Sequence, residues 1–154
     1  MSLSPIRKRA VDGLKAGDNF TVWRTFGEED IRRFADISRD YNPVHFDERF
    51  AAAKHFQGRI CHGLLVGTLL TEIGGQIGWL ASGMQFAFRK PVYPGQTVRC
   101  DFKLTEVDEK GRARAEALFT NGSGEIVLEA VLTGILPGSE EKRIMKRMPV
   151  DDTR

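Results

Sequence analysis

Cysteine and histidine are scarce in this sequence. Cys61 and Cys100 are the only cysteines, and the 154 residues include three histidines. The chain has no Cys-x-x-Cys pair and no cluster of cysteine and histidine at the spacing of zinc ligands. We therefore expect neither a disulfide framework nor a structural metal site, and we expect a reduced, cytoplasmic protein.

The chain also lacks an excess of charge of one sign and a long apolar run. Lysine and arginine number 23 against 21 aspartates and glutamates, a net charge of +2 that is too small for a surface built to bind nucleic acid. The most apolar stretch, residues 62–80, contains Glu72, Gln76 and several glycines, so it does not predict a membrane span. The basic N-terminus has no apolar segment after it and does not resemble a secretory signal. Neither a nucleic acid nor a membrane is an expected partner.

The composition that remains is that of an ordinary globular protein. Apolar residues make up 41% of the chain and charged residues 29%, which are close to average values for soluble domains. A chain of this length can bury about two thirds of its unfolded surface in a single core. The sequence therefore predicts one domain.

The first half of the chain carries helical patterns. Residues 19–26 have the character of a strand, and Thr25 followed by Glu28 predicts a capping box that starts a helix. A short helix is predicted near residues 48–54. A long buried helix is predicted from residue 63 to about residue 80 because this segment is largely apolar.

The second half alternates between apolar and polar residues. Its four alternating segments are separated by the turn-forming sequences YPG, DEKG and NGSG, which predict strands joined as hairpins. A buried helix beside an antiparallel sheet is an α+β architecture. The alternating residues are Met84, Phe86 and Phe88; Val98, Cys100, Phe102 and Leu104; Ala113, Ala115, Ala117 and Phe119; and Ile126, Leu128, Ala130 and Leu132.

An aspartate and a histidine flank an Asn-Pro break in the sequence SRDYNPVH at residues 38–45. Because the chain leaves a helix there, the turn can direct Asp40 and His45 into one cleft. A carboxylate and an imidazole can together hold a water, with one accepting a proton while the other positions or returns it. The structural alternative is an Asx-type turn at Asp40 and a half-buried, hydrogen-bonded ring at His45.

The start of the long helix, RICHGLL at residues 59–65, is the second candidate site. Free amides at a helix N-terminus can donate to a substrate oxygen that becomes negative, and Gly63 lets the substrate approach closely. A tight turn explains Gly63 equally well, and an ordinary first-turn position explains His62. Glu72, the only charge in this helix, is either a catalytic base or a residue at the solvent rim.

Small residues share one face of the same helix. Gly63, Gly67, Thr71, Gly75 and Gly78 recur at intervals of three and four. Each interior glycine costs about 1 kcal/mol relative to alanine, so something must pack closely against this face. The stripe predicts either tight packing against a neighbouring element or a slender acyl tunnel, to which Thr71 offers a hydroxyl.

Taken together, these motifs resemble the MaoC-like family, which includes the R-specific enoyl-CoA hydratases. The resemblance implies a hot-dog fold, in which a curved antiparallel sheet wraps a long central helix. The segments that carry it are SRDYNPVH at 38–45, FAA at 50–52, HGLL at 62–65, FRKPV at 88–92 and PG at 94–95.

The resemblance also divides the chain. It implies an N-terminal extension over residues 1–16, a hot-dog domain over residues 17–136 and a charged tail over residues 137–154. Within that tail, the composition of residues 139–154 predicts a solvated or frayed terminus.

The resemblance further assigns roles to residues. It implies a catalytic pair at Asp40 and His45 and an oxyanion-binding amide at Gly63. The family often has glycine where this chain has Arg39, and some members have serine where it has Thr71. The residues expected to bind substrate are Asn42, His62, Gly67, Thr71 and Arg39, with Asn42 orienting the pair or its water and Arg39 reaching a CoA phosphate.

The expected function is therefore R-specific hydration of an enoyl-CoA or the reverse dehydration of a 3-hydroxyacyl thioester. The substrate would be an acyl-CoA or an acyl-carrier-protein thioester, the working unit a homodimer or higher homo-oligomer, and no metal or redox cofactor would be required. Two alternatives remain: an acyl-CoA thioesterase with Glu72 as base, and a non-catalytic acyl-CoA binding module.

Overall fold

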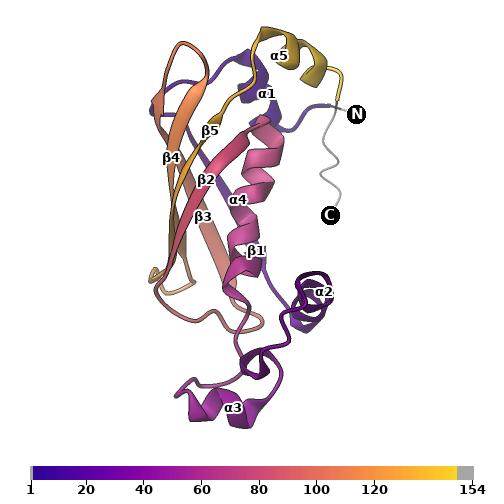
Figure 1. Ribbon diagram of the computed structural model, residues 1–154, viewed down its shortest axis with the longest axis vertical. Helices are drawn as coiled ribbons and strands as arrows, with labels where there is room; N and C mark the ends of the chain where they lie inside the picture. Colours follow the sequence, from indigo (N-terminus) through magenta and orange to yellow (C-terminus); the bar gives the residue numbers. More distant parts are fainter. Residues whose placement is uncertain (1, 149–154) are drawn as a thin grey trace.

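The computed structural model describes residues 2–148. Residues 149–154 of the predicted tail lie outside the described part of the chain. Figure 1 shows a long helix, α4, lying against a twisted sheet, with short helices at both ends of this body. The α+β class predicted from the sequence is confirmed.

Five strands form one antiparallel sheet in the order β1, β3, β4, β5, β2. In β4, buried alanines and Phe119 alternate with exposed residues, which are polar except for Leu118, as expected for a sheet with one covered face. The four strands predicted in the second half are all present. The strands are β1 (Asn19–Thr25), β2 (Leu80–Phe88), β3 (Thr97–Val107), β4 (Arg112–Thr120) and β5 (Ile126–Ile135).

The predicted hairpin around YPG is wrong. Strand β2 pairs with β5, whereas β3 lies between β1 and β4, so residues 89–96 cross from one edge of the sheet toward the other. The amides of Arg89 and Lys90 both donate to the carbonyl oxygen of Val127, which fixes the start of this crossing to β5. The turn residues mark a crossover rather than a hairpin.

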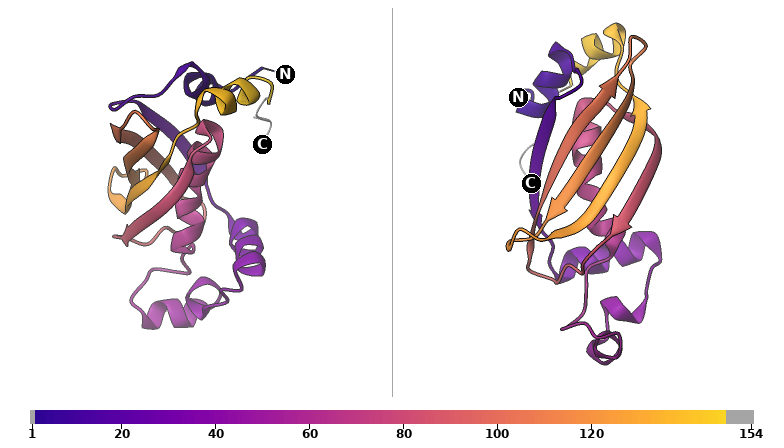
Figure 2. Two further views of the ribbon diagram at one scale, coloured as in Figure 1. Left: turned by 45° about the horizontal axis from the view of Figure 1, so that its top comes forward. Right: turned by 90° about the vertical axis from the view of Figure 1, so that its left-hand side faces the viewer.

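Helix α4 (Gly63–Ile77) lies along one face of the sheet (Figure 2), and eight of its residues are buried. It ends at Ile77 rather than near residue 80, because Gly78 takes a left-handed φ of 71° and caps it. A Cβ at Gly78 would lie 2.7 Å from Pro137, so a side chain there is excluded as well. The buried residues of α4 are Leu65, Val66, Gly67, Leu69, Leu70, Ile73, Gln76 and Ile77.

Three short elements extend beyond the end of the body where α4 begins (Figure 1): α2 (Glu28–Ser38), the 3-10 helix η1 (Pro43–His45) and α3 (Glu48–Ala53). The capping box predicted at Thr25 is wrong, because Thr25 is the last residue of β1. The cap of α2 is Gly27, whose amide donates to Asp30 at 2.8 Å. We call residues 28–58, which contain these three elements, the overhang.

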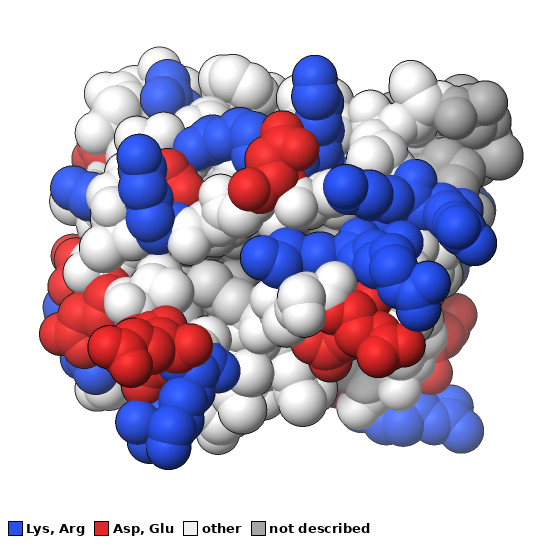
Figure 3. Space-filling view, turned by 90° about the horizontal axis from the view of Figure 1, so that it is seen from above, with Lys and Arg blue, Asp and Glu red and all other residues white. Residues whose placement is uncertain are grey.

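At the opposite end of the body, α1 (Pro5–Asp12) and α5 (Ser139–Met145) pack beside the end of α4. Arg7 donates to the carbonyl oxygens of Gly75 and Gln76, which lie in the last turn of α4. Within α5, Met145 is 8% exposed, whereas most of the other residues are exposed, so this part of the predicted tail is helical and buries one side chain. Seen from this end, lysines and arginines are interspersed with acidic residues (Figure 3).

Strand β2 forms one edge of the sheet, and several of its apolar side chains are exposed. Leu80, Met84 and Phe88 are 73%, 45% and 57% exposed. Such an edge leaves main-chain groups and apolar side chains open to another chain. None of the helices within residues 2–148 is long and apolar enough to span a membrane.

Candidate active site

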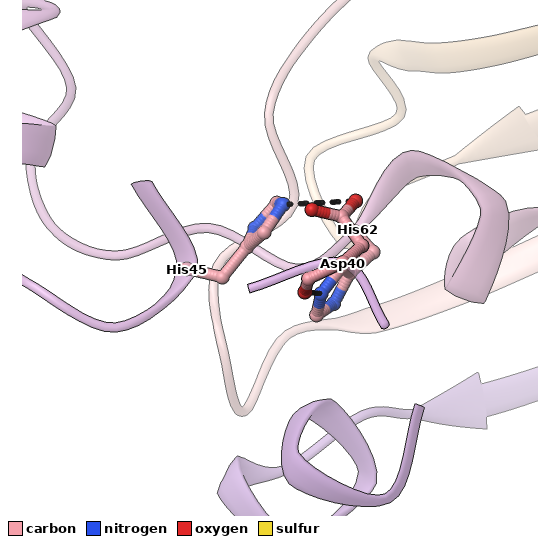
Figure 4. Close-up of side chains that lie close together, drawn as sticks. All are labelled: Asp40, His45 and His62. Carbon is pink, nitrogen blue, oxygen red and sulfur yellow. Dashed lines mark hydrogen bonds and ion pairs between the residues drawn. The ribbon is translucent and has the colours of Figure 1, made fainter. Parts of the chain in front are cut away.

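A pocket of about 610 Å³ lies where the overhang meets the start of α4. Asp40, His45, His62 and Gly63 all line it, so four residues singled out in the sequence come together. Most of the remaining wall is apolar, as in a site for a hydrophobic substrate with a few polar groups to orient it. Figure 4 shows the His45 ring directed toward the carboxylate of Asp40.

His45 ends η1 and is held in one tautomer by the main chain. Its Nδ1 lies 2.7 Å from the carbonyl oxygen of Ile60, which can only accept, so Nδ1 carries the proton. The lone pair is then on Nε2, which lies 3.8 Å from Oδ2 of Asp40. Burial lowers the pKa of His45 below 6.5, against the opposing effects of Ile60 and Asp40. At neutral pH the ring is an uncharged proton acceptor.

Asp40 follows the end of α2, where Arg39 takes a left-handed φ of 63° and turns the chain out of the helix. Its Oδ1 accepts the amide of Asn42 at 3.1 Å, which makes an Asx-type turn. Its Oδ2 faces His45, and the side chain is 49% exposed. The turn and the pairing with His45 coexist because each uses a different oxygen.

His62 connects these two residues. It is 1% exposed, and its Nε2 donates to the main-chain oxygen of Asp40 at 3.0 Å. Its ring stacks on that of His45, with centroids 3.7 Å apart and planes at 27°. Phe34 of α2 packs on it too, at a centroid distance of 4.9 Å. His62 thereby fixes the place of both members of the pair.

Gly63 is the first residue of α4, and His62 caps that helix without a side-chain hydrogen bond. The first amides of a helix have no acceptor within it, so they remain free to donate to a ligand. A Cβ on Gly63 would lie 2.3 Å from the ring of Phe88. Glycine at this position thus lets the Phe88 ring lie against the helix start.

Asp40, His45 and His62 also bring potential metal ligand atoms within 4.8 Å of one another. The lone pairs of imidazole nitrogens lie in the ring planes, and two stacked rings direct theirs along nearly parallel planes instead of toward one point. This arrangement suits hydrogen bonds to a water better than coordination of one ion.

Comparison with known proteins identifies the family. The family model described as a MaoC like domain matches residues 13–125. The chain belongs to the MaoC-like family. This MaoC-like chain is 32% identical over 130 residues to the mitochondrial 3-hydroxyacyl-[acyl-carrier-protein] dehydratase of Arabidopsis thaliana, covering 80% of this chain and 78% of that protein.

Two further comparisons concern Aeromonas caviae. The MaoC-like chain is 30% identical over 130 residues to the (R)-specific enoyl-CoA hydratase of that organism, covering 80% of this chain and 97% of the hydratase. A solved structure of the A. caviae (R)-hydratase matches with a TM-score of 0.75 at 28% identity, over 81% of this chain and 98% of that one. The family and the hot-dog fold predicted from the sequence are confirmed, and these relatives are named as hydro-lyases, the enzyme class that the sequence leads us to expect.

Four of the residues expected to bind substrate do not line the pocket of this MaoC-like protein. Arg39 is exposed at the end of α2, and the side chain of Asn42 instead accepts the amide of Val44 at 3.2 Å and caps η1. Gly67 packs against Phe86, whose ring lies 3.3 Å from the position of a Cβ. Thr71 lies farther along α4, where it lines a separate cavity of about 170 Å³.

Several residues of the pocket wall were not predicted as site residues from the sequence pattern. Phe34 comes from α2, while Phe88, Arg89, Lys90 and Val92 come from the end of β2 and the crossover. The position of Phe88 and of the crossover residues depends on the pairing of β2 with β5, which no local pattern encodes. For residues 88–92, the sole signal in the sequence is the family resemblance, to which the FRKPV segment contributes.

The overhang is tied to the start of α4 by residues 59–62. The amide of Ile60 donates to Val44 at 3.3 Å, and the amide of Cys61 donates to Val92 at 2.7 Å. Arg59 begins this segment and binds both helices of the overhang: its guanidinium donates to Glu28 at 2.6 and 3.0 Å and to Glu48 at 2.9 Å. One side chain thus joins the first turns of α2 and α3.

Arg59→Ala is expected to lower both stability and turnover. The variant loses three charge-assisted hydrogen bonds and leaves Glu28 and Glu48 without their shared cation, at a cost of about 1 kcal/mol for a partly exposed network. Arg59→Lys should recover only part of the loss because an ammonium cannot replace the planar fork. Melting temperature and kcat measure both effects. The control is Arg33→Ala, which removes a pair within α2; an equal effect there would contradict a special role for Arg59.

Proposed function

We propose that this protein adds water reversibly to the double bond of a trans-2-enoyl thioester and forms an (R)-3-hydroxyacyl thioester. The observation that supports this most directly is the neutral His45 paired with Asp40 in an apolar pocket that also contains the first amide of α4. The stereochemistry follows the names of the relatives.

The spacing of the pair suits one water. Oδ2 of Asp40 and Nε2 of His45 are 3.8 Å apart, which is too long for a direct hydrogen bond. A water between them can contact both atoms. The carboxylate accepts one hydrogen of this water, and the imidazole accepts the other.

The proposed steps balance without an outside reagent. His45 takes a proton from the water through Nε2 while the water oxygen bonds to the β-carbon, and Asp40 orients the water. The electrons of the double bond move toward the thioester carbonyl, whose oxygen accepts a hydrogen bond from the Gly63 amide. The imidazolium then gives its proton to the α-carbon, and the pair returns to its first state. These steps require no redox or metal cofactor.

The alternative of thioester hydrolysis has less support. Glu72 does not line the pocket and forms an ion pair with Arg24 of β1. Cys61 does line it, but burial raises the pKa of its thiol to about 12, so this thiol is a poor nucleophile. A non-catalytic binding module would make no use of the pairing between Asp40 and His45.

The proposed working unit is a homodimer that joins two copies through the open edge at β2. Leu80, Met84 and Phe88 on this strand would be covered, and its unpaired main-chain groups would gain partners. The sedimentation coefficient of the purified protein distinguishes a dimer from a single chain.

One assay tests the reaction. The protein is mixed with trans-2-butenoyl-CoA, and the absorbance of the conjugated enoyl group is followed together with free thiol. We expect the absorbance to fall without release of thiol. Thiol release from the acyl-CoA would point to a thioesterase, and no change in either signal would favour a binding module.

The pH dependence of kcat/KM is expected to show a fall on the acid side. Because burial lowers the pKa of His45, the neutral ring persists below pH 6.5, and protonation at still lower pH removes the proton acceptor. The same lowered pKa means that the stability gained from neutral His45 is present above 6.5 and is lost as the pH falls. An acid limb with its midpoint above 6.5 would contradict neutral His45 as the base.

A further inference from the structure

Three charged residues line the pocket: Asp40, Arg89 and Lys90. Asp40 belongs to the overhang, whereas the two cations follow the end of β2. Among the described residues, the acidic residue of the lining therefore belongs to the reacting pair, and the two basic residues of the lining belong to the crossover. A substrate with an anionic part is repelled from the first region and attracted to the second.

The main chain of Arg89 and Lys90 is anchored to β5, whereas their side chains form exposed ion pairs. Both amides donate to the carbonyl oxygen of Val127, at 2.9 and 3.2 Å, which anchors this part of the wall to β5. The Arg89 guanidinium pairs with Glu129 at 2.7 Å, and the Lys90 ammonium pairs with Glu125. All four side chains are between 38% and 58% exposed. Ion pairs this exposed contribute little stability, so a stronger anion can displace the carboxylates.

We propose that Arg89 and Lys90 form a phosphate-binding site for the carrier of the acyl group, and that Glu129 and Glu125 occupy these cations until the substrate binds. The inference rests on the proposed function, because it takes the substrate to be a thioester of a phosphorylated pantetheine arm. CoA and the prosthetic group of an acyl carrier protein share this chemistry. The phosphates of CoA together offer more charge and more acceptor oxygens than one carboxylate, which favours the exchange.

The position of Phe88 supports this direction for the arm. Its ring lies against Gly63, whose amide would hold the thioester carbonyl. Arg89 and Lys90 come next in the chain, so the pocket wall beside the carbonyl continues into the two cations. Arg39, the residue suggested by the sequence for this role, does not line the pocket.

The test compares thioesters that differ only in phosphate. Hydration of butenoyl-CoA, butenoyl-phosphopantetheine and butenoyl-pantetheine is measured for the wild type and for Arg89→Glu/Lys90→Glu. The double variant should raise KM for the CoA thioester by about tenfold or more, with kcat and the pantetheine thioester little changed. Lys8→Glu/Lys15→Glu makes the same change in net charge at exposed positions outside the pocket and should leave KM unchanged.

The two phosphorylated substrates show which phosphate is bound. A rise in KM with phosphopantetheine indicates the phosphate common to CoA and the acyl carrier protein, and a rise with CoA alone indicates the phosphates of its nucleotide. Glu125→Gln/Glu129→Gln should lower KM for the CoA thioester because the competing carboxylates are gone. An unchanged KM for CoA in the double variant, or an equal rise with pantetheine, would overturn the proposal.

A binding measurement tests the phosphate site without relying on the hydration reaction. The affinity of saturated butanoyl-CoA, which cannot be hydrated, is measured by calorimetry for the same proteins. A weaker affinity in Arg89→Glu/Lys90→Glu, with butanoyl-pantetheine unaffected, supports the phosphate site even if no hydration is found. Loss of the proposed function and loss of the proposed site are therefore distinct results.

Discussion

Asp40→Asn and His45→Gln are each expected to lower kcat for hydration by about 10²–10⁴-fold, the usual contribution of a positioned acid or base. An asparagine at position 40 keeps one oxygen for the turn to Asn42 but removes the negative charge that faces His45. A glutamine at position 45 has no group that takes a proton at neutral pH. Because both residues hold the same water, the double variant should lose little more than either single variant.

The controls use residues of the same kind elsewhere in the overhang. Asp36→Asn changes an exposed acid on α2 whose carboxylate only accepts a hydrogen bond from Tyr41. His55→Gln changes an exposed histidine after α3. Both should retain wild-type turnover, and circular dichroism should show that all the variants are folded. Full hydration activity in folded Asp40→Asn would refute the mechanism.

The second large effect is expected at Gly63, where the amide and the space can be separated. Proline removes the amide hydrogen, and it suits the first position of a helix. The preceding residue, His62, already has φ −61° and ψ 135°, which a following proline favours. Any side chain at position 63 meets Phe88, so the comparison is made in a Phe88→Ala background.

In that background, Gly63→Pro should lower kcat by about 10²–10³-fold relative to Gly63→Ala, as expected for the loss of one oxyanion donor. Alanine keeps the amide and supplies the same Cβ, so it controls for bulk. Thermal melting checks that the two variants are equally folded. Equal turnover of the two would mean that the Gly63 amide is not the donor.

Local pattern predicts the elements whose two faces differ. Strands β3 and β4 alternate because one face is buried against α4 and the other is in solvent. In β2 the same alternation carries less information, since Met84 and Phe88 remain 45% and 57% exposed. Pairing of β2 with β5 is a long-range choice, which explains why the hairpin predicted around YPG does not form.

The N-terminal helix is difficult to predict from the sequence for a different reason. Helix α1 is short and largely polar, and its buried residues are Ala10 and Val11. What fixes it is the contact of Arg7 with the carboxyl end of α4, some seventy residues away in sequence. A charge pattern cannot show that an arginine serves as the cap of a distant helix.

The candidate site was predictable where the chemistry is local. Asp40 and His45 come together because an Asn-Pro break bends the chain between them, and Gly63 begins the helix that the apolar pattern indicates. Asn42 was expected to orient the pair or its water, but its side-chain oxygen accepts the amide of Val44 two residues later. Competition from such short-range hydrogen bonds is not visible in a motif.

The two stacked histidines are both anchored by main-chain oxygens, and this has a further consequence. His45 is held by the main-chain oxygen of Ile60, and His62 by that of Asp40. Every amino acid supplies such an oxygen, so the identity of the residue that provides it is free to vary as long as the backbone path is kept. A substitution at position 60 can therefore leave the tautomer of His45 unchanged, because the acceptor belongs to the backbone and not to the side chain.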